Sequence, residues 1–172
     1  MSYKNFIICI LSVLLLAGCA SRTRSSELSM SAQEYLQLAA TTQGSVRNDY
    51  LLLAASRYLE MHQTKAASHI LTALQQAQLN PQQAIQWRLL QAKTILLNGK
   101  AQSAINFLQV LQTQPPQDKQ QQLLLATTLA HAYASIGNVA ASLQQRQQIL
   151  NLSADKDTQQ QVISDTWIYL QS

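Results

Sequence analysis

Cysteine is scarce in this sequence, which holds two in 172 residues, Cys9 and Cys19. Cys9 lies inside an apolar N-terminal run, and Cys19 follows directly after that run. Export would remove the first and modify the second, as argued below. We therefore expect no disulfide and no cysteine metal ligand in the mature chain, although an exported protein meets conditions that permit disulfides.

Charged side chains are also few, at 12% of residues against about 25% in an ordinary domain. Glutamine takes much of their place, so the predicted surface is polar but weakly charged. The net charge of +4 comes from basic residues that are scattered along the chain. No run or helix face concentrates them, which argues against a nucleic-acid partner.

Glycine and histidine are too few and too dispersed to form a familiar catalytic motif. The four glycines form no phosphate-binding loop and no Gly-x-Ser-x-Gly elbow. His62, His69 and His131 are not paired four residues apart around a glutamate, and we expect His62 at a helix end and His131 facing outward. Asp155-Lys156-Asp157 lacks the glycine and distal glutamate of a calcium loop, so it is interpreted as a helix start. We predict no catalytic residue, metal site, cofactor or small-molecule substrate, and hence no enzyme.

The N-terminus has the pattern of a lipoprotein export signal. Lys4 precedes the apolar run Phe6–Leu16, which is shorter than the roughly 20 residues needed to span a bilayer. Leu16-Ala17-Gly18-Cys19 then matches the lipobox of lipoprotein signals. This match predicts cleavage between Gly18 and Cys19 and attachment of diacylglycerol to the Cys19 thiol; the alternative is an ordinary signal with a chance cysteine.

Several acyl chains on Cys19 would hold the protein permanently at a membrane, because one chain alone binds only marginally. Ala20 stands where an aspartate would retain a lipoprotein at the inner membrane, which favours the periplasmic face of the outer membrane. We expect a signal peptide at 1–18, the lipidated cysteine and a Ser-rich flexible tether at 19–30, and one folded domain at 31–172.

The predicted domain is all-α, with no convincing alternating strand. Ser31 and Glu34 form a capping-box pattern, Asn80-Pro81 starts a helix and Pro115-Pro116 breaks one. Hydrophobic periodicity predicts about eight helices. Their approximate ranges are 31–42, 46–62, 65–77, 81–99, 101–113, 118–136, 139–151 and 155–170.

A repeat of 37 to 38 residues indicates a tetratricopeptide-like stack of antiparallel helical hairpins. Ala55-x-x-Tyr58, Ala92-x-x-Ile95 and Ala130-x-x-Tyr133 recur at that interval, and Gly99 and Gly137 follow the last two copies. A small residue and a large one then open the next helix in each of the first two copies, and the pairs are Ala67 with Leu71 and Ala104 with Leu108.

The repeat has departures, and an irregular helical bundle remains the alternative. His62 replaces the glycine in the first copy, and Ser142 and Arg146 replace the small and large apolar residues in the third. One helix of the third copy has two apolar stripes, which predicts neighbours on both sides. The first stripe is Leu125, Leu129, Ala132 and Ile136, and the second is Ala126, Ala130 and Tyr133.

Three short stretches, in this order and spacing, carry a family resemblance: Tyr50–Ala54, Leu89–Lys93 and Thr166–Leu170. Together with the lipobox and tether, they make the chain resemble the N-terminal part of the LpoA (LppC) family of penicillin-binding protein activators. The resemblance implies an outer-membrane lipoprotein that regulates peptidoglycan synthesis by contact with a bifunctional class A penicillin-binding protein.

That family also has a ligand-binding-type C-terminal domain, which is understood to make the activating contact. The sequence given stops at Ser172, where that domain would follow. Two expectations stay open: a truncated or split form of an activator, or a helical domain that works alone. A different class of function is also open, a tetratricopeptide-type lipoprotein adaptor of an outer-membrane assembly complex.

Trp87 and Trp167 are candidate interface residues, because tryptophan is enriched at binding hot spots. Packing between hairpins is the competing interpretation for both. Trp167 has an added one, since the resemblance places its helix next to the second domain. The glutamine clusters Gln120–Gln122 and Gln144–Gln148 are interpreted as solvated helix faces.

Overall fold

The computed structural model describes residues 30–75, 78–153 and 156–171. For residues 75 and 165–171 it describes the backbone alone. The predicted signal peptide, Cys19 and nearly all of the predicted tether lie outside these residues. Ser31–Ser172 form one compact unit, and the account below concerns that unit alone.

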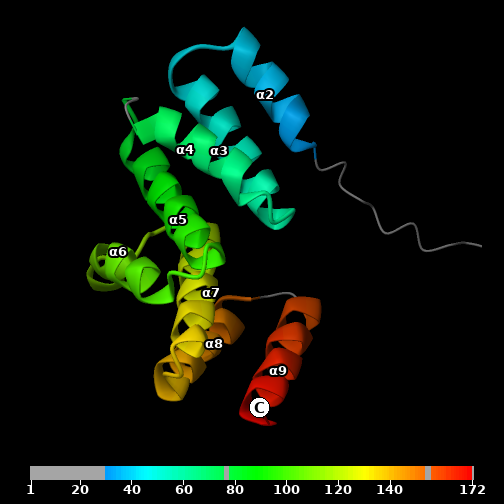
Figure 1. The fold of residues 1–172 in the computed structure, drawn as a ribbon, viewed down its shortest axis with the longest axis vertical. Helices are drawn as coiled ribbons and strands as arrows, with labels where there is room; N and C mark the ends of the chain where they lie inside the picture. The colour runs from blue at the N-terminus through cyan, green and yellow to red at the C-terminus, as the bar shows by residue number, and fades with distance from the viewer. Residues whose placement is uncertain (1–29, 76–77, 154–155, 172) are drawn as a thin grey trace, which may run out of the picture. The chain divides into compact units, whose positions relative to one another are not determined.

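The described residues form eight helices and no strand (Figure 1), as the hydrophobic periodicity predicts. Their boundaries agree with the sequence prediction to within about two residues at most ends. The helices are α2 (Ala32–Thr41), α3 (Gly44–Glu60), α4 (Thr64–Gln75), α5 (Pro81–Leu97), α6 (Ala101–Thr113), α7 (Lys119–Ser135), α8 (Val139–Leu152) and α9 (Lys156–Gln171).

Side chains cap the helices where the sequence predicts. At the start of α2, the Glu34 backbone N–H donates to Ser31 Oγ at 3.2 Å and the Ser31 N–H donates to Glu34 Oε2 at 2.6 Å. Asn80 and Gln83 form the same reciprocal pair at the start of α5, with Pro81 in the first turn. These bonds satisfy amides that a helix N-terminus otherwise leaves without partners.

Three tight hairpin turns repeat one backbone motif, and they join α3 to α4, α5 to α6 and α7 to α8. The turn residues are His62, Gly99 and Gly137, with φ of 57°, 78° and 74°. In each turn the next N–H donates back to a carbonyl five residues earlier. The three bonds are Gln63 to Tyr58 at 2.8 Å, Lys100 to Ile95 at 3.2 Å and Asn138 to Tyr133 at 2.9 Å.

This pattern is the Schellman motif, in which a left-handed residue follows the helix end. Glycine adopts that conformation without a Cβ penalty, which explains Gly99 and Gly137. His62 adopts it too, so the first copy departs from the sequence pattern in residue type but keeps the backbone of the turn.

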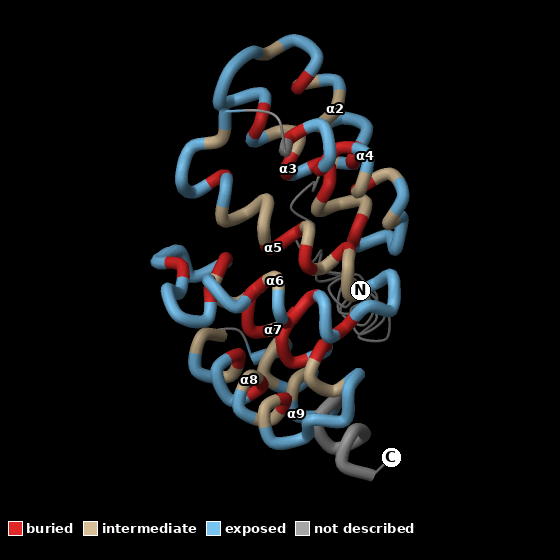
Figure 2. Tube along the Cα trace, turned by 60° about the vertical axis from the view of Figure 1, so that its left-hand side comes forward, coloured by how far each residue is buried: buried red, intermediate tan, exposed pale blue. Residues whose placement is uncertain are grey.

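Two larger core clusters and one small cluster lie along the stack. The first joins α3, α4 and α5, and the second joins α5, α6 and α7. The third contains three fully buried residues, Ala126, Ala130 and Ile149, between α7 and α8. Figure 2 shows buried segments in red along α3, α5 and α7, and α3 packs on α5 as α5 packs on α7. The first helices of the hairpins therefore stack on one another, as expected for a tetratricopeptide-like domain.

The small-then-large pattern of the second helices is confirmed in the first two hairpins, and the third departs from it in residue type as the sequence indicates. Ala67 with Leu71 and Ala104 with Leu108 are completely buried. Ser142 is 0% exposed and Arg146 is 8% exposed, so the polar residues of the third hairpin occupy the same buried positions. The Ser142 hydroxyl donates to the Ala130 carbonyl at 3.0 Å, which satisfies it inside the core.

Helix α7 buries two faces, as its two stripes predict. Leu125, Leu129 and Ala132 belong to the second core cluster, whereas Ala126 and Ala130 belong to the third. Two assignments in the stripes were wrong: Ile136 is 43% exposed, and Tyr133 packs against the second cluster rather than the third. Ile136 is the C-cap residue of α7, where the helix ends and the turn into α8 begins.

Buried glutamines link the first helices of successive hairpins. Gln83 Nε2 donates to the Ser45 carbonyl at 2.8 Å and to Asp49 Oδ1 at 2.7 Å. Gln121 Nε2 likewise donates to the Gln82 carbonyl at 3.1 Å. The interpretation of Gln121 as solvated was therefore wrong: it is buried, and its amide gains a backbone partner in the preceding repeat.

Candidate functional site

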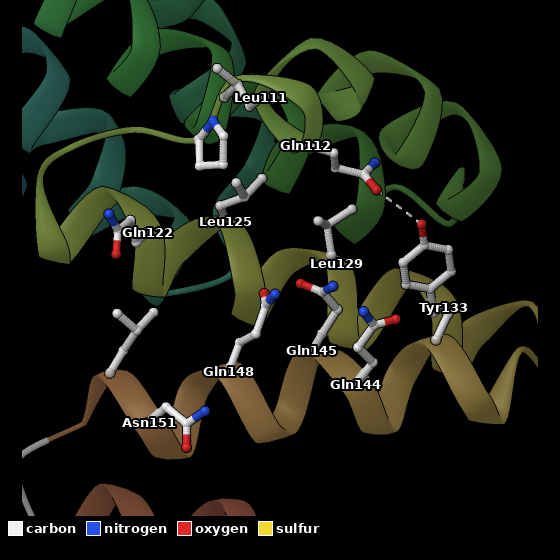
Figure 3. A pocket seen from close by; sticks show the side chains of 13 residues that line it. Leu111, Gln112, Gln122, Leu125, Leu129, Tyr133, Gln144, Gln145, Gln148 and Asn151 are labelled. Carbon is white, nitrogen blue, oxygen red and sulfur yellow. Dashed lines mark hydrogen bonds between the residues drawn. The ribbon is translucent and has the colours of Figure 1, made fainter.

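A groove of about 520 Å³ runs between α6, α7 and α8. This volume lies within the range of about 300–1,000 Å³ that is usual for ligand sites. Figure 3 shows its two sides, with α7 above α8 and with Gln112 reaching in from α6. The lining residues are Leu111, Gln112, Pro115, Gln122, Leu125, Leu129, Tyr133, Ala141, Gln144, Gln145, Gln148, Asn151 and Leu152.

Leucines form an apolar surface on the α6 and α7 side of the groove. Leu125 and Leu129 lie one turn apart on α7, and Leu111 joins them from the last turn of α6. All three are buried members of the second core cluster, so packing behind the groove fixes their positions. The groove is therefore built on the rigid part of the stack.

Carboxamides line the opposite side. Gln144, Gln148 and Asn151 lie on one face of α8, because residues four and three apart share a face of a helix. Figure 3 shows Gln144, Gln145 and Gln148 extending from α8 toward the leucines of α7. Each carboxamide offers both a hydrogen-bond donor and an acceptor.

None of the described residues that line the groove carries a charge. Tyr133 is the aromatic residue among them, and it forms a hydrogen bond of 3.2 Å between its hydroxyl and Gln112 Oε1. A neutral, hydrogen-bonding lining next to an apolar surface suits uncharged polar ligands and provides no counter-ion for a charged one.

The other face of α8 holds the groove in place. Ile149 packs on Ala126 and Ala130, and the Ser142 hydroxyl bonds to the Ala130 carbonyl. Small residues on α7 let the two helices approach, while Gln144 and Gln148 lie beside this contact and line the groove. The sequence predicted the cluster Gln144–Gln148 of α8 as solvated, and Gln144, Gln147 and Gln148 are exposed. The prediction was wrong for Arg146, which is 8% exposed, and the groove beside the cluster was missed.

Trp87, a predicted interface candidate, lies within the stack rather than in this groove. Its indole Nε1 donates to the Leu71 carbonyl at 2.8 Å, and its ring packs edge-on against Phe107 with centroids 6.2 Å apart. It is partly buried against the first core cluster. These contacts fit the packing interpretation of Trp87.

The remaining predicted site residues are not brought together. Gly18, Cys19 and Asp155 lie outside the described residues, as does the side chain of Trp167 on α9. The three histidines are exposed, and the structure places His62 in its hairpin turn. Within the described ranges, no group of three or more acidic, histidine or cysteine side chains could hold a metal ion.

The fold and the groove define a class: a tetratricopeptide-like helical repeat domain with a surface suited to recognition. The chain is similar in fold to the N-terminal domain of LpoA from Haemophilus influenzae, with a TM-score of 0.71 and 22% identity over 83% of this chain and 64% of that one. The amino-terminal domain of E. coli LpoA gives a TM-score of 0.68 at 25% identity, over 83% of this chain and 62% of that one.

The sequence assigns the family. Residues 25–172 match the family described as "LppC putative lipoprotein", and the chain belongs to that family. The penicillin-binding protein activator LpoA of Vibrio cholerae is 28% identical over 102 residues, which cover 55% of this chain and 17% of that protein. The activator of the same name from Vibrio antiquarius is 31% identical over 104 residues, 56% of this chain and 16% of that protein.

The chain thus spans about a sixth of the length of these curated relatives. They are named as activators and not as enzymes. Among the helices that the structure describes, none combines the length and the apolar character that a membrane crossing requires.

Proposed function

We propose that this protein is a lipid-anchored regulator of peptidoglycan synthesis that acts by contact with a class A penicillin-binding protein. The observation that carries the proposal is the match of residues 25–172 to a lipoprotein family whose curated relatives are named penicillin-binding protein activators. In this proposal the helical repeat domain supplies the recognition surface, and the relatives' name of activator supports action by contact.

The proposed anchor is the acylated thiol of Cys19 after cleavage behind Gly18. Two or more acyl chains contribute about 0.8 kcal/mol for each buried methylene, which is sufficient for stable attachment. With Ala20 next to the lipid, the proposed location is the periplasmic face of the outer membrane. The domain that begins at Ser31 would then lie close to its anchor, because the eleven residues 20–30 reach about 36–40 Å when fully extended.

Labelled palmitate tests the anchor, and the chain provides a matched control. We expect Cys19→Ala to abolish incorporation of labelled palmitate in cells, whereas Cys9→Ala leaves it unchanged, since Cys9 lies in the part that is removed. Labelling of the Cys19→Ala variant at the wild-type level would contradict the proposed anchor.

Affinity capture of the full chain from detergent extracts tests the partner. Recovery of a class A penicillin-binding protein supports the proposal. Recovery of an outer-membrane assembly complex in its place supports the adaptor function and contradicts the regulator. Recovery of neither contradicts both, because each requires a stable protein contact.

A further inference from the structure

We propose that the groove between α6, α7 and α8 binds an extended, uncharged peptide segment of about four residues, with alternating apolar and polar side chains. This inference deepens the proposed function and rests on it in one respect: such a segment would belong to the partner that the domain recognises. The chemistry of the groove leads to the ligand class independently of which partner carries the segment.

The hydrogen-bonding capacity of the groove matches polar, uncharged peptide side chains. Six carboxamides line it, and a carboxamide can both accept and donate a hydrogen bond. Gln122 already donates to the Pro116 carbonyl at 2.7 Å and Gln112 already accepts from Tyr133, so Gln144 and Gln148 of α8 carry the argument. Gln144 and Gln148 are one helical turn apart, a rise of about 6 Å. An extended chain presents every second side chain on one face, about 6.6 Å apart, so the two spacings nearly coincide.

The length of the amide face sets the length of the segment. From Gln144 to Asn151 the helix rises about 10 Å. Extended peptide advances about 3.3 Å per residue, so three to four residues cover this face. The groove therefore fits a short linear stretch and is too short for a whole strand of ordinary length.

The leucine surface adds side-chain selectivity. Successive side chains of an extended peptide point to opposite faces. When the polar side chains bond to the α8 amides, the alternate side chains face Leu111, Leu125 and Leu129 on the opposite side. Aliphatic side chains gain from burial there, whereas a charged one would lose its hydration beside a lining that carries no counter-charge.

The same surface distinguishes a peptide from a glycan. A sugar presents hydroxyls around its ring, and burial of a hydroxyl against leucine without a partner is unfavourable. Tyr133, the aromatic residue among those lining the groove, has its hydroxyl engaged by Gln112. The apolar surface consequently favours aliphatic peptide side chains over a glycan strand.

Saturation-transfer difference NMR tests the inference with the lipidated full chain in lipid nanodiscs and empty nanodiscs as the blank. The probe is the blocked tetrapeptide acetyl-Leu-Asn-Leu-Asn-amide. We expect saturation to reach its leucine methyl protons from the protein. The double variant Gln144→Ala with Gln148→Ala should weaken binding about tenfold or more, because two amide partners are lost.

Gln109→Ala is the matched control, since Gln109 is an exposed glutamine on α6 that does not line the groove. It should leave binding unchanged, and the far-ultraviolet circular dichroism of all variants should match the wild type. Absence of binding, equal binding by the double variant, or equal binding of a lysine-substituted peptide would overturn the inference. Preferential binding of a tetramer of N-acetylglucosamine would overturn it in favour of a glycan site.

These results are independent of the proposed partner. Peptide binding without capture of a penicillin-binding protein would retain the groove assignment and remove the regulator. If the chain binds no peptide but the double variant still captures the synthase, the groove assignment alone is removed.

Discussion

The second and third hairpins share one backbone plan but differ in the chemistry of their helix contacts. Between α5 and α6 the buried pair is Ala104 and Leu108, and Leu108 belongs to a cluster of nine buried apolar residues. Between α7 and α8 the corresponding pair is Ser142 and Arg146, and the buried cluster contains three residues. Turn geometry and stacking are therefore preserved while the apolar content of the contact falls.

The difference fits the proposed division of roles, in which one repeat serves stability and another serves recognition. A leucine-filled contact gains free energy from burial, about 1.5–3 kcal/mol for each large side chain. The third hairpin instead uses small residues and a buried hydrogen bond, and its α8 turns a row of carboxamides toward a groove. We expect the second hairpin to be the more stable of the two.

The largest expected effect is the loss of Leu108 from the second hairpin. Leu108→Ala should lower the free energy of unfolding by about 2–5 kcal/mol, because it leaves a cavity in a fully buried site. Urea denaturation followed by circular dichroism measures the change. Val110→Ala, at a side chain that is 54% exposed on the same helix, is the control and should change stability by about 0.5 kcal/mol or less.

The turns offer a second way to sharpen the comparison. Gly99→Ala should cost about 1–2 kcal/mol, because an L-residue with a Cβ is strained at a positive φ. His62→Gly should have the opposite sign and stabilise the first hairpin by up to about 1 kcal/mol. Thermal melts of both variants measure whether each substitution raises or lowers the stability. Destabilisation by His62→Gly would show that contacts of the imidazole stabilise the turn by more than the backbone strain destabilises it.

In the third hairpin, we expect removal of the buried Ser142 hydroxyl to lower the free energy of unfolding by a smaller amount. Ser142→Ala removes the bond to the Ala130 carbonyl and should cost about 0.5–1.5 kcal/mol. Ser142→Leu should cost more, since the site is completely buried and the inserted atoms would push α8 from α7. Hydrogen exchange of α8 amides localises both effects; equal exchange in all three proteins would contradict a structural role for Ser142.

The smallest effect is expected at the start of α2, outside both hairpins. The Ser31 backbone N–H, and next the Ser31 hydroxyl, hold the pKa of Glu34 below its ordinary value. A carboxyl with a lowered folded-state pKa stabilises the fold above its unfolded pKa, and this contribution is lost as the pH falls through the folded-state value. In the wild type, we expect the first turn of α2 to become less ordered below a pH of about 4.3, the ordinary pKa of a glutamate. Glu34→Gln should abolish this pH dependence, and amide exchange of α2 measures it.

Local sequence signals were sufficient for the helices, for the two caps at Ser31 and Asn80 and for two of the three turns. Ser31, Asn80 and Gly99 each act through bonds to neighbours a few residues away, which a sequence pattern records directly. His62 was recognised as a departure, but its left-handed conformation follows from the hydrogen bonds of the turn and the packing of α3 on α4.

Features that depend on residues far apart in the chain were harder to predict. Gln121 looked like one of a run of solvated glutamines, and only the position of α5 shows why it is buried. The groove required α6, α7 and α8 to be placed together. The spacing of Gln144, Gln148 and Asn151 was the one signal available, because it gathers carboxamides on the face opposite to Ile149.

The central claim is that this chain regulates a synthase by contact, and the rate of glycan-strand polymerisation tests it most directly. The measurement uses a class A penicillin-binding protein reconstituted in liposomes, with and without the lipidated chain. We predict a rate that rises with the amount of chain and saturates. A rate that stays the same at every concentration would contradict the account.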